Sequence, residues 1–311
     1  MRIAVFGAGA VGGYFGARLA RAGEDVVFIA RGAHLEAIRQ RGLSVESPLG
    51  DFHIYPAQAT DSPEEVGPVD VVLVGVKAWQ VPEVAPKMGP LLGPETFIVP
   101  LENGVEAPDQ LAAVWGKERV LGGLCRIIST VPEPGRVRHG GMEPYVAFGE
   151  LDNRPSERAR QLQAAFERAG VRAEIPADIH VALWEKFLFI TPFAGMGAVT
   201  RAPVGILRSV PQLRRMLEEA IAEAFAVGRA RGVRLPDDAP ARTMALIDGM
   251  PPQGTTSMQR DIIAGKPSEL DYLVGAVVRL GEAAGLETPI HRFLYYALWP
   301  QERRARGELA F

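Results

Sequence analysis

The stretch RIAVFGAGAVG (residues 2–12) decides the fold. Residues 3–6 are apolar and indicate a buried strand, and residues 7–12 fit the pattern G-x-G-x-x-G at the start of a helical stretch. The first glycine permits a tight turn, the second lets backbone approach a pyrophosphate, and the third lets helix and strand pack closely. A glycine turn without a ligand is the alternative, but strand, loop and helix together favour dinucleotide binding. The residues expected to hold the cofactor here are Gly7, Gly9, Ala10, Val11 and Gly12.

The second predicted strand, residues 26–30, ends in Arg31. Many NAD enzymes carry Asp or Glu at this point, where the carboxylate accepts from the ribose 2′-hydroxyl. A guanidinium can instead pair bidentately with a 2′-phosphate, which an acid would repel. Arg31 therefore predicts NADPH rather than NADH, with an ordinary solvated arginine as the alternative.

Strands and helices alternate through the first half of the chain. This pattern predicts a parallel sheet with helices on both faces. The predicted strands are residues 3–6, 26–30, 69–76, 97–100 and 120–124, followed by 135–139, 145–149 and 171–175. The predicted helices are residues 14–22, 34–41, 108–115 and 154–169.

After residue 175 the strand patterns end and helical spacing takes over. We expect residues 1–176 to form an α/β Rossmann-type domain that binds NADP, and residues 177–311 to form an all-α domain, an arrangement like that of 6-phosphogluconate dehydrogenase. The expected helices of this second part are residues 178–193, 211–232, 240–248, 268–284 and 289–306.

Composition excludes several classes of protein. The 311 residues are 47% hydrophobic and 23% charged, the balance of a soluble globular protein. The formal net charge of -3 gives no general attraction to nucleic acid or to an anionic membrane, and we expect neither as a partner. Cys125 is the single cysteine and cannot form an intrachain disulfide, which suits a reducing compartment. The histidines are scattered without the spacing of a metal site. We expect a cytoplasmic protein without a metal.

The chain resembles the ketopantoate reductase (2-dehydropantoate 2-reductase) family over essentially its whole length. Such proteins join a Rossmann domain to a helical domain, use NADPH, and reduce 2-dehydropantoate to (R)-pantoate for pantothenate synthesis. The resemblance thus implies a small 2-oxo acid substrate in a cleft between two domains, and leaves a homodimer open. The matching pieces are residues 7–12, Arg31-Gly32, Lys77-Ala78-Trp79-Gln80, Asn103-Gly104, Trp184-x-Lys186, Thr256-Ser257-Met258-Gln259 and Glu269-Leu270-Asp271-Tyr272.

The resemblance gives several side chains a role in reduction. Hydride delivery to a 2-oxo carbon creates a developing alkoxide that needs a proton, and Lys186 resembles the family's general acid. Glu269 resembles the catalytic carboxylate that holds the substrate hydroxyl, and Ser257 resembles a donor to the substrate carboxylate. Asn103 resembles a bridge between cofactor and substrate. Lys77 and Gln80 resemble residues on the cofactor side.

Each role has a structural alternative. A lysine on an apolar helix commonly reaches solvent, as Lys186 would do. Glu269 lies where an acid only complements a helix start, and Thr256-x-x-Gln259 fits a capping box that would use nearby hydroxyls. Asn103-Gly104 is also a common turn dipeptide. The basic run at residues 303–306 is interpreted as a solvated helix end.

The family pattern breaks on the helix of the lysine. Two asparagines commonly follow that lysine, four and eight residues beyond it, and here Ile190 and Ala194 occupy these positions. Thr191, Ser257 or a water could replace one lost contact. The loss also leaves open a related NADPH-dependent reductase of a different 2-oxo acid, or a protein that senses NADP(H) without turnover.

Overall fold

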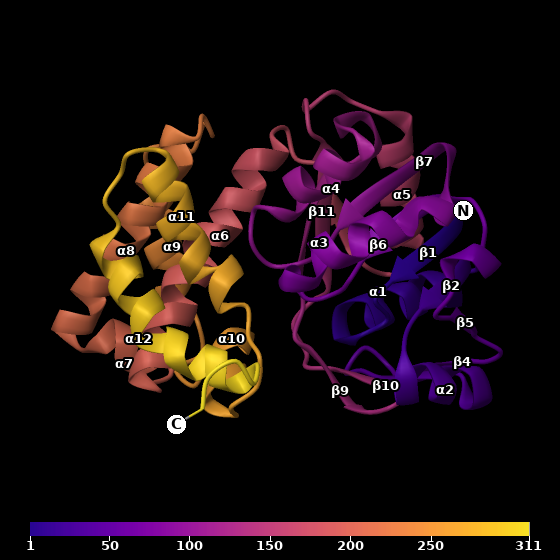
Figure 1. Cartoon of the computed structure of the whole chain (residues 1–311), viewed down its shortest axis with the longest axis horizontal. Coiled ribbons are helices and arrows are strands. Elements are labelled where there is room, and N and C mark those ends of the chain that lie inside the picture. The colour runs from indigo at the N-terminus through magenta and orange to yellow at the C-terminus, as the bar shows by residue number, and fades with distance from the viewer. Residues whose placement is uncertain (311) are drawn as a thin grey trace. The chain divides into compact units, whose positions relative to one another are not determined.

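The computed structural model describes residues 1–310. Its N-terminal part contains the predicted parallel sheet (Figure 1). Its strand order is β5-β2-β1-β6-β7, and every pair in it is parallel. The chain leaves β1 for one edge and then returns to β6 beside β1, so the order reverses there. In such sheets ligands bind beyond the carboxyl ends of the strands at this reversal. The strands are β1 (Arg2–Phe6), β2 (Asp25–Ile29), β5 (Gln58–Thr60), β6 (Val69–Val74) and β7 (Leu92–Pro100).

Both faces of this sheet are buried, which explains the continuous apolar runs in its strands. Successive residues of a strand point to opposite faces. Accordingly Ile3 and Val5 belong to one buried apolar cluster, whereas Ala4 and Phe6 belong to another. Helices cover the sheet as expected, and those of this unit are α1 (Ala10–Arg21), α2 (Gly32–Arg41), α3 (Val81–Val84), α4 (Ala107–Trp115) and α5 (Glu157–Arg168).

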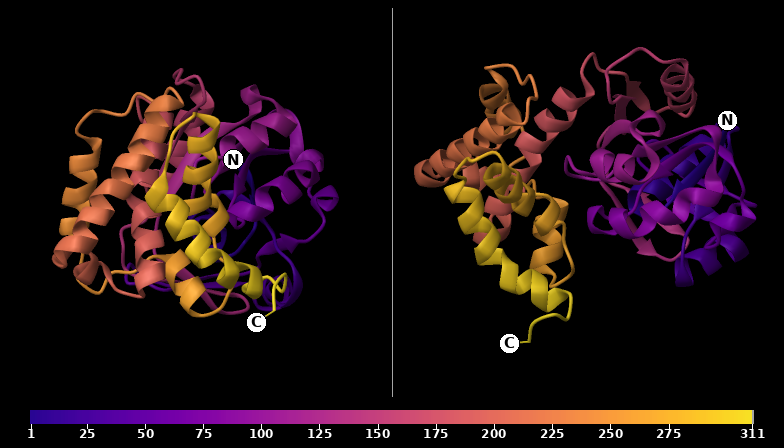
Figure 2. Two further views of the ribbon diagram at one scale, coloured as in Figure 1. Left: turned by 60° about the vertical axis from the view of Figure 1, so that its left-hand side comes forward. Right: turned by 45° about the horizontal axis from the view of Figure 1, so that its top comes forward.

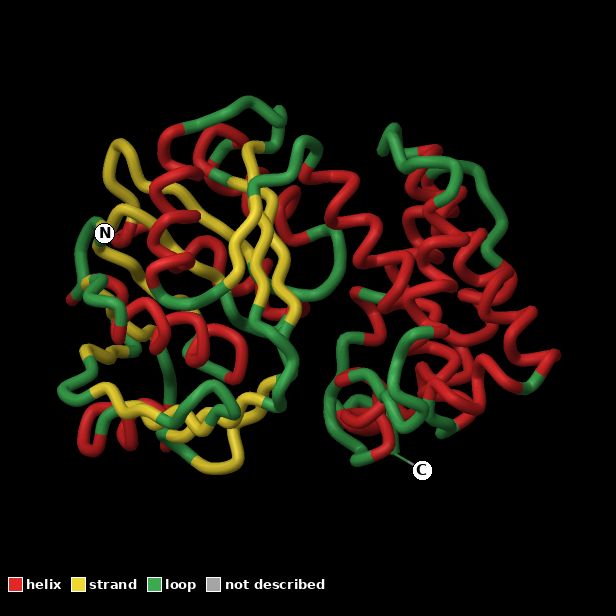
Figure 3. The backbone as a smooth tube through the Cα atoms, turned by 180° about the vertical axis from the view of Figure 1, so that it is seen from behind, coloured by secondary structure: helices red, strands yellow, loops and turns green. Residues whose placement is uncertain are grey.

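The prediction of a parallel sheet is wrong for the strand at residues 120–124, which lies outside it, as do the strands predicted after residue 124 without assignment to a sheet. These lie in two further sheets that contain antiparallel pairs, visible with the first sheet in Figure 3. The first holds β3 (Leu43–Glu46), β4 (Phe52–Ile54), β9 (Ser129–Glu133) and β10 (Arg136–His139), and the second holds β8 (Leu121–Arg126), β11 (Tyr145–Glu150) and β12 (Arg172–Glu174). Strands β4, β5 and β9 were not predicted, because they are short and largely polar or exposed. Strand β3 was missed although Leu43 and Val45 are buried, because only four residues carry its alternation.

Within the described residues the second half is helical, as predicted. Figure 2 shows α11 and α12 near the yellow end of the colour scale, and both contact α8. Two helices of this half, α7 and α10, were not predicted, and neither was α3 of the first half. The helices are α6 (Ile179–Thr200), α7 (Val204–Ser209), α8 (Pro211–Ala230), α9 (Ala239–Asp248), α10 (Ser257–Ile263), α11 (Val274–Ala283) and α12 (Pro289–Ala305).

Two predicted helices of the second half differ clearly from the structure. Helix α6 was expected to end at residue 193 but continues to Thr200, even though Pro192 lies within it. Residues 191–198 are all buried, and tertiary packing outweighs the weak helix propensity of proline and glycine. The stretch expected as one helix from residue 268 is split into a 3-10 turn, Leu270–Tyr272, and α11.

Contacts divide the chain into two compact units. Met1–Glu102 and Glu106–Ile179 form the first, while Asn103–Val105 join the residues from His180 onward in the second. Over residues 1–310, no helix is long and apolar enough to cross a membrane, and no group of three His, Cys, Asp or Glu side chains could hold a metal ion.

Candidate active site

The glycine loop between β1 and α1 has the close approaches that its pattern requires. Gly7 adopts a φ of +99°, and a Cβ on it would lie 2.6 Å from the side chain of Val76. A Cβ on Gly12 would collide with the carbonyl oxygen of Gly7, so helix and loop pack only because this residue is glycine. Gly75, directly after β6, also touches the loop, since its Cβ would lie 2.8 Å from the Gly12 Cα. Sequence reasoning missed Gly75, whose signal was a lone glycine after a central strand.

Gly9, in contrast, faces open space. Nothing lies within 4 Å of the position that its Cβ would take. The amides of Gly7 and Ala8 donate to the carbonyl of Ile29, at 3.0 and 3.2 Å, whereas the Gly9 amide has no acceptor among the described residues. Gly9 is the N-cap of α1, and no acidic residue lies in the first helical turn. Free amides and a helix N-terminus beside open space fit the pyrophosphate of a dinucleotide.

Arg31 follows β2 and is the N-cap residue of α2. Its side chain is exposed and makes no hydrogen bond or ion pair within the described part of the chain. The pKa of the exposed Glu83 is lowered by the hydrogen bond and the charge of Lys87 and, last among the causes, by the charge of Arg31. The guanidinium thus has an acid nearby but no hydrogen bond, and it can still pair with an anion, as the 2′-phosphate prediction requires.

Lys77 and Gln80 follow β6 on the same sheet. Lys77 is exposed, with its Nζ 5.7 Å from the centroid of the Trp79 ring. Its backbone amide donates to the side-chain oxygen of Gln80 at 3.1 Å. Gln80 therefore has a local role that sequence reasoning did not foresee, and its amide nitrogen is the atom that a ligand could meet.

Asn103 and Glu269 come together in the second unit, although 166 positions separate them. The Asn103 Nδ2 donates to the Glu269 Oε2 at 2.8 Å. Glu269 is only 4% exposed and precedes a 3-10 turn rather than an α-helix, so it does not act as the acid of a helix N-terminus. The structure thus brings together two side chains that the resemblance placed around the substrate.

The segment around Glu269 is held from α12. Both oxygens of Glu302, which is 1% exposed, accept from the Ser268 amide at 3.1 Å, and the Ser268 hydroxyl donates to Glu302 as well. The Arg306 Nε donates to Glu302 at 2.7 Å and another of its nitrogens donates to the Ser268 carbonyl at 3.0 Å. The charged side chains of Glu302 on α12 and of Arg306, the C-cap residue of that helix, therefore fix the residue directly before Glu269.

Asp271, two residues after Glu269, is held from the same helix. It accepts from the Tyr295 hydroxyl at 2.7 Å and from Arg303 at 2.8 Å. Burial and the bond to Asp271 raise the pKa of Tyr295 to about 12, so the hydroxyl remains a donor at neutral pH. The interpretation of residues 303–306 as a solvated helix end is therefore wrong for Arg303 and Arg306. Their charges gave no signal of these distant partners.

Lys186 lies on α6 and is only 9% exposed, whereas lysines are rarely buried. The neighbouring Phe187 is 1% exposed. One turn further Ile190 is half-buried, and Ala194 is fully buried, so neither offers a polar side chain to a ligand. Thr191 is buried and its hydroxyl has no partner in the described chain, but five residues turn a helix by about 140° from the lysine's face.

Ser257 begins α10, and its hydroxyl is not needed as a cap. The Thr256 Oγ1 accepts from the Gln259 amide at 3.1 Å and fills that role. The Gln259 side chain does not complete the capping box, because its nitrogen donates to the Ala202 carbonyl and its oxygen has no partner among residues 1–310. Ser257 is half-buried and can donate to a ligand.

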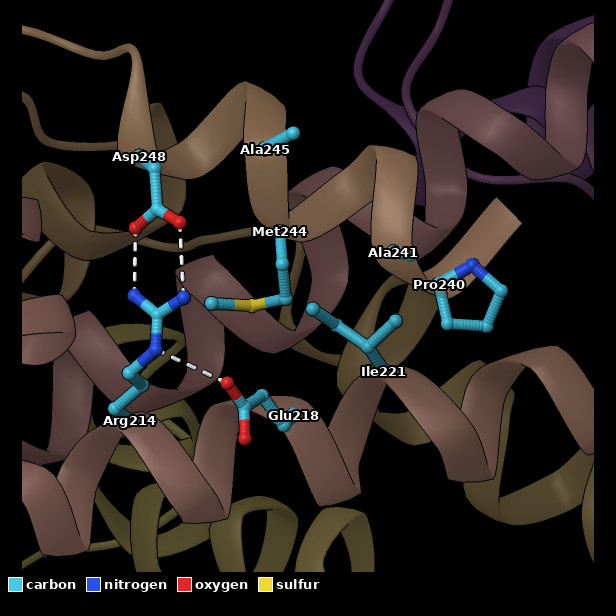
Figure 4. A pocket seen from close by; sticks show the side chains of 8 residues that line it. All are labelled: Arg214, Glu218, Ile221, Pro240, Ala241, Met244, Ala245 and Asp248. Carbon is cyan, nitrogen blue, oxygen red and sulfur yellow. Dashed lines mark hydrogen bonds and ion pairs between the residues drawn. The ribbon is translucent and has the colours of Figure 1, made fainter. Parts of the chain in front are cut away.

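A groove of about 400 Å³ lies elsewhere in the helical unit, between α8 and α9 (Figure 4). It contains none of the predicted site residues. Arg214 crosses it with a bidentate ion pair to Asp248, at 2.6 and 2.9 Å, and contacts Glu218 at 3.0 Å. These charges satisfy one another, so the groove presents no unpaired polar group. Its lining residues are Arg214, Glu218, Ile221, Pro240, Ala241, Met244, Ala245 and Asp248.

The fold and these side chains define a class: a Rossmann-type α/β unit carrying a dinucleotide loop, joined to a helical unit with a buried lysine. Comparison with known proteins places the chain within that class. Residues 3–153 match the family described as Ketopantoate reductase PanE/ApbA, and residues 178–302 match its C-terminal domain. The chain belongs to the ketopantoate reductase family and is an oxidoreductase.

Three similar proteins illustrate this membership. A 2-dehydropantoate 2-reductase of Mesorhizobium japonicum is 33% identical and aligns over 93% of this chain and 94% of its own. An uncharacterized oxidoreductase of Bacillus subtilis is 32% identical and aligns over 95% of this chain and 97% of its own. The crystal structure of a 2-dehydropantoate 2-reductase from Geobacter metallireducens is 34% identical with a TM-score of 0.89, over 96% and 99%.

Proposed function

We propose that this chain reduces 2-dehydropantoate to (R)-pantoate with NADPH. The observation that carries the proposal is the Asn103–Glu269 hydrogen bond at 2.8 Å, in the same unit as the buried Lys186. A carboxylate that is nearly excluded from solvent and oriented by an amide is suited to recognising one hydroxyl group. The nicotinamide supplies, when bound, the hydride that reduces the 2-oxo carbon.

The side chains divide the remaining work. Lys186 donates a proton from Nζ to the carbonyl oxygen as hydride reaches the carbon, which yields the 2-hydroxy acid. Asn103 donates a hydrogen bond to Oε2 of Glu269, and Oε1 of the same carboxylate accepts a hydrogen bond from the substrate hydroxyl. Ser257 donates to the substrate carboxylate. Water is kept from the proton donor by the apolar helix around it.

NADPH is proposed over NADH because Arg31 makes no hydrogen bond or close ion pair in the described chain and follows β2, where an acid would hold the NAD ribose. Replacing it tests this directly. We expect Arg31→Ala to weaken NADPH binding about tenfold or more and to leave NADH binding nearly unchanged. Titration of each dinucleotide by fluorescence measures the two affinities, and an equal loss for both would remove the 2′-phosphate assignment.

The substrate is tested with a panel of 2-oxo acids, following the absorbance of the reduced nicotinamide. Preference for 2-dehydropantoate supports the proposal. Ile190 favours a second candidate, an acid with a more apolar tail, because this half-buried side chain replaces a hydrogen-bonding one near Lys186. A kcat/KM higher for such acids than for 2-dehydropantoate would replace the first assignment with the second.

We also infer a cytoplasmic location and a small-molecule substrate, in keeping with the single, buried Cys125 and the mild negative charge. A homodimer stays a prediction, which light scattering of the purified chain tests.

A further inference from the structure

His34 lies on the first turns of α2 and reaches back to the glycine loop. Its Nε2 is 2.8 Å from the carbonyl oxygen of Ala8, and the backbone amide of Gly135 donates to its Nδ1 at 3.1 Å. Because Nδ1 accepts a hydrogen bond, it carries no proton, and Nε2 is the nitrogen that donates to Ala8. The imidazole is therefore neutral in this arrangement. Burial lowers the pKa of His34, only partly opposed by the bond to Ala8.

The second partner of His34, Gly135, is itself firmly placed. It lies in the turn between β9 and β10 with a φ of +79°, and a Cβ there would lie 3.0 Å from the Ala37 Cβ on α2. Its carbonyl accepts from the Ser44 amide of β3 at 2.9 Å. Since both polar groups of Gly135 are used, the turn is a fixed support for the imidazole rather than a loose neighbour.

The contact with Ala8 determines where the next amide points. The peptide between Ala8 and Gly9 is planar and trans, so its C=O and N–H point in opposite directions. The Ala8 amide is already tied to Ile29, and His34 ties the Ala8 carbonyl. Together these bonds direct the Gly9 N–H away from α2. This is the amide that has no acceptor, on the residue that faces open space.

We propose that His34 is a positioning residue for dinucleotide binding: it holds the Ala8–Gly9 peptide in the orientation that presents the Gly9 N–H to the pyrophosphate. The inference rests on the proposed use of NADPH. His34 itself does not contact the cofactor. It acts through the peptide group of the loop, and without it that peptide can rotate and must be reordered when the ligand binds.

The test compares two ligands that share the adenosine 2′-phosphate but not the pyrophosphate. His34→Ala should weaken NADPH binding about tenfold, the scale of one lost charge-assisted hydrogen bond, and leave the affinity for 2′-AMP within about twofold of the unchanged chain. His53→Ala is the matched control, since that imidazole is exposed and bonds only the Ser44 hydroxyl in the same unit. It should bind both ligands as the unchanged chain does.

His34→Gln keeps the readout if the alanine variant does not fold. Its amide offers a donor and an acceptor without the rigid spacing of the ring, so we expect a smaller loss of NADPH affinity, about threefold, again with 2′-AMP unchanged. The inference is overturned if NADPH affinity is unaltered, or if both ligands weaken equally, which would mean that His34 only stabilises the domain. If the unchanged chain binds neither NADPH nor NADH, the proposed function falls and the inference with it.

Discussion

The glycine loop and the surroundings of Glu269 are two polar binding regions built in opposite ways. The loop is largely local: its turn and its free amide lie within residues 7–12. Its contacts outside that stretch include those with the ends of the two adjoining strands, at Ile29 and at Gly75 and Val76, and with His34 on α2. Glu269 depends on Asn103, which lies 166 positions before it, and on α12, whose Glu302 fixes the preceding Ser268. In the sequence, a local binding region is recognisable as a motif. A distributed region is present only as scattered charged residues, whose partners are not known until the chain is folded.

The largest expected effect tests the proposed proton donor, Lys186, which lies in the same unit as Glu269. Lys186→Ala should lower kcat about a hundredfold or more, because the alkoxide loses its proton donor, while NADPH affinity stays within about twofold. Steady-state kinetics at saturating NADPH measure the first quantity and fluorescence titration the second. Lys87→Ala is the control, since that lysine is exposed and pairs only with Glu83. Full turnover by the Lys186 variant would contradict the assignment of the acid.

The next effect breaks the support of Glu269 from α12. Glu302→Ala should lower the free energy of unfolding by about 3 kcal/mol, because it removes one member of a buried charged cluster, and should raise KM more than it lowers kcat. Urea unfolding and steady-state kinetics give the two readouts. Asp248→Ala removes an exposed ion pair in the same unit and should cost less than about 1 kcal/mol with unchanged KM. Equal destabilisation by both variants would show that buried Glu302 contributes no more stability than an exposed ion pair does.

This contrast explains how far sequence reasoning reached. The fold class, the β1 strand and the dinucleotide loop were predictable because periodicity and glycine spacing express local geometry. Strands such as β4 were missed because three residues with little burial carry no periodic signal. The end of α6 was misplaced because packing around Pro192 overrides propensity. Arg306 was interpreted as solvated because its partners, Glu302 and Ser268, cannot be paired with it from spacing alone.

A pair of glycine variants sharpens the comparison within the loop itself. Gly12→Ala should lower the free energy of unfolding by about 2 kcal/mol, because its Cβ would collide with the Gly7 carbonyl. Gly9→Ala should leave stability within about 0.5 kcal/mol, because its Cβ meets open space, yet weaken NADPH binding by filling the approach of the pyrophosphate. Urea unfolding and NADPH titration separate the two. A Gly9 variant that binds NADPH normally would argue against the predicted path of the cofactor.

The smallest expected effect concerns the other end of α12. Glu223 of α8 accepts from the amides of Ile290 and His291, at 2.8 and 3.0 Å, and from the His291 ring at 2.7 Å. Burial alone would raise the pKa of Glu223, but these hydrogen bonds outweigh it and hold the pKa below the ordinary value of 4.5. A carboxyl whose folded pKa is depressed contributes stability above its unfolded pKa and loses it as pH falls through the folded pKa.

Glu223→Gln removes this titration while keeping an acceptor for one amide. The unchanged chain should be the more stable at neutral pH, and the difference in unfolding free energy should shrink as the pH falls below about 4.5. Urea unfolding of both proteins at each pH from 7 to 3 measures this difference in unfolding free energy. A difference independent of pH would mean that Glu223 supports α12 by packing and neutral hydrogen bonds alone. A shrinking difference would show that α12, which holds the segment around Glu269, is fixed by charged groups at both of its ends, whereas the glycine loop contains no charged side chain.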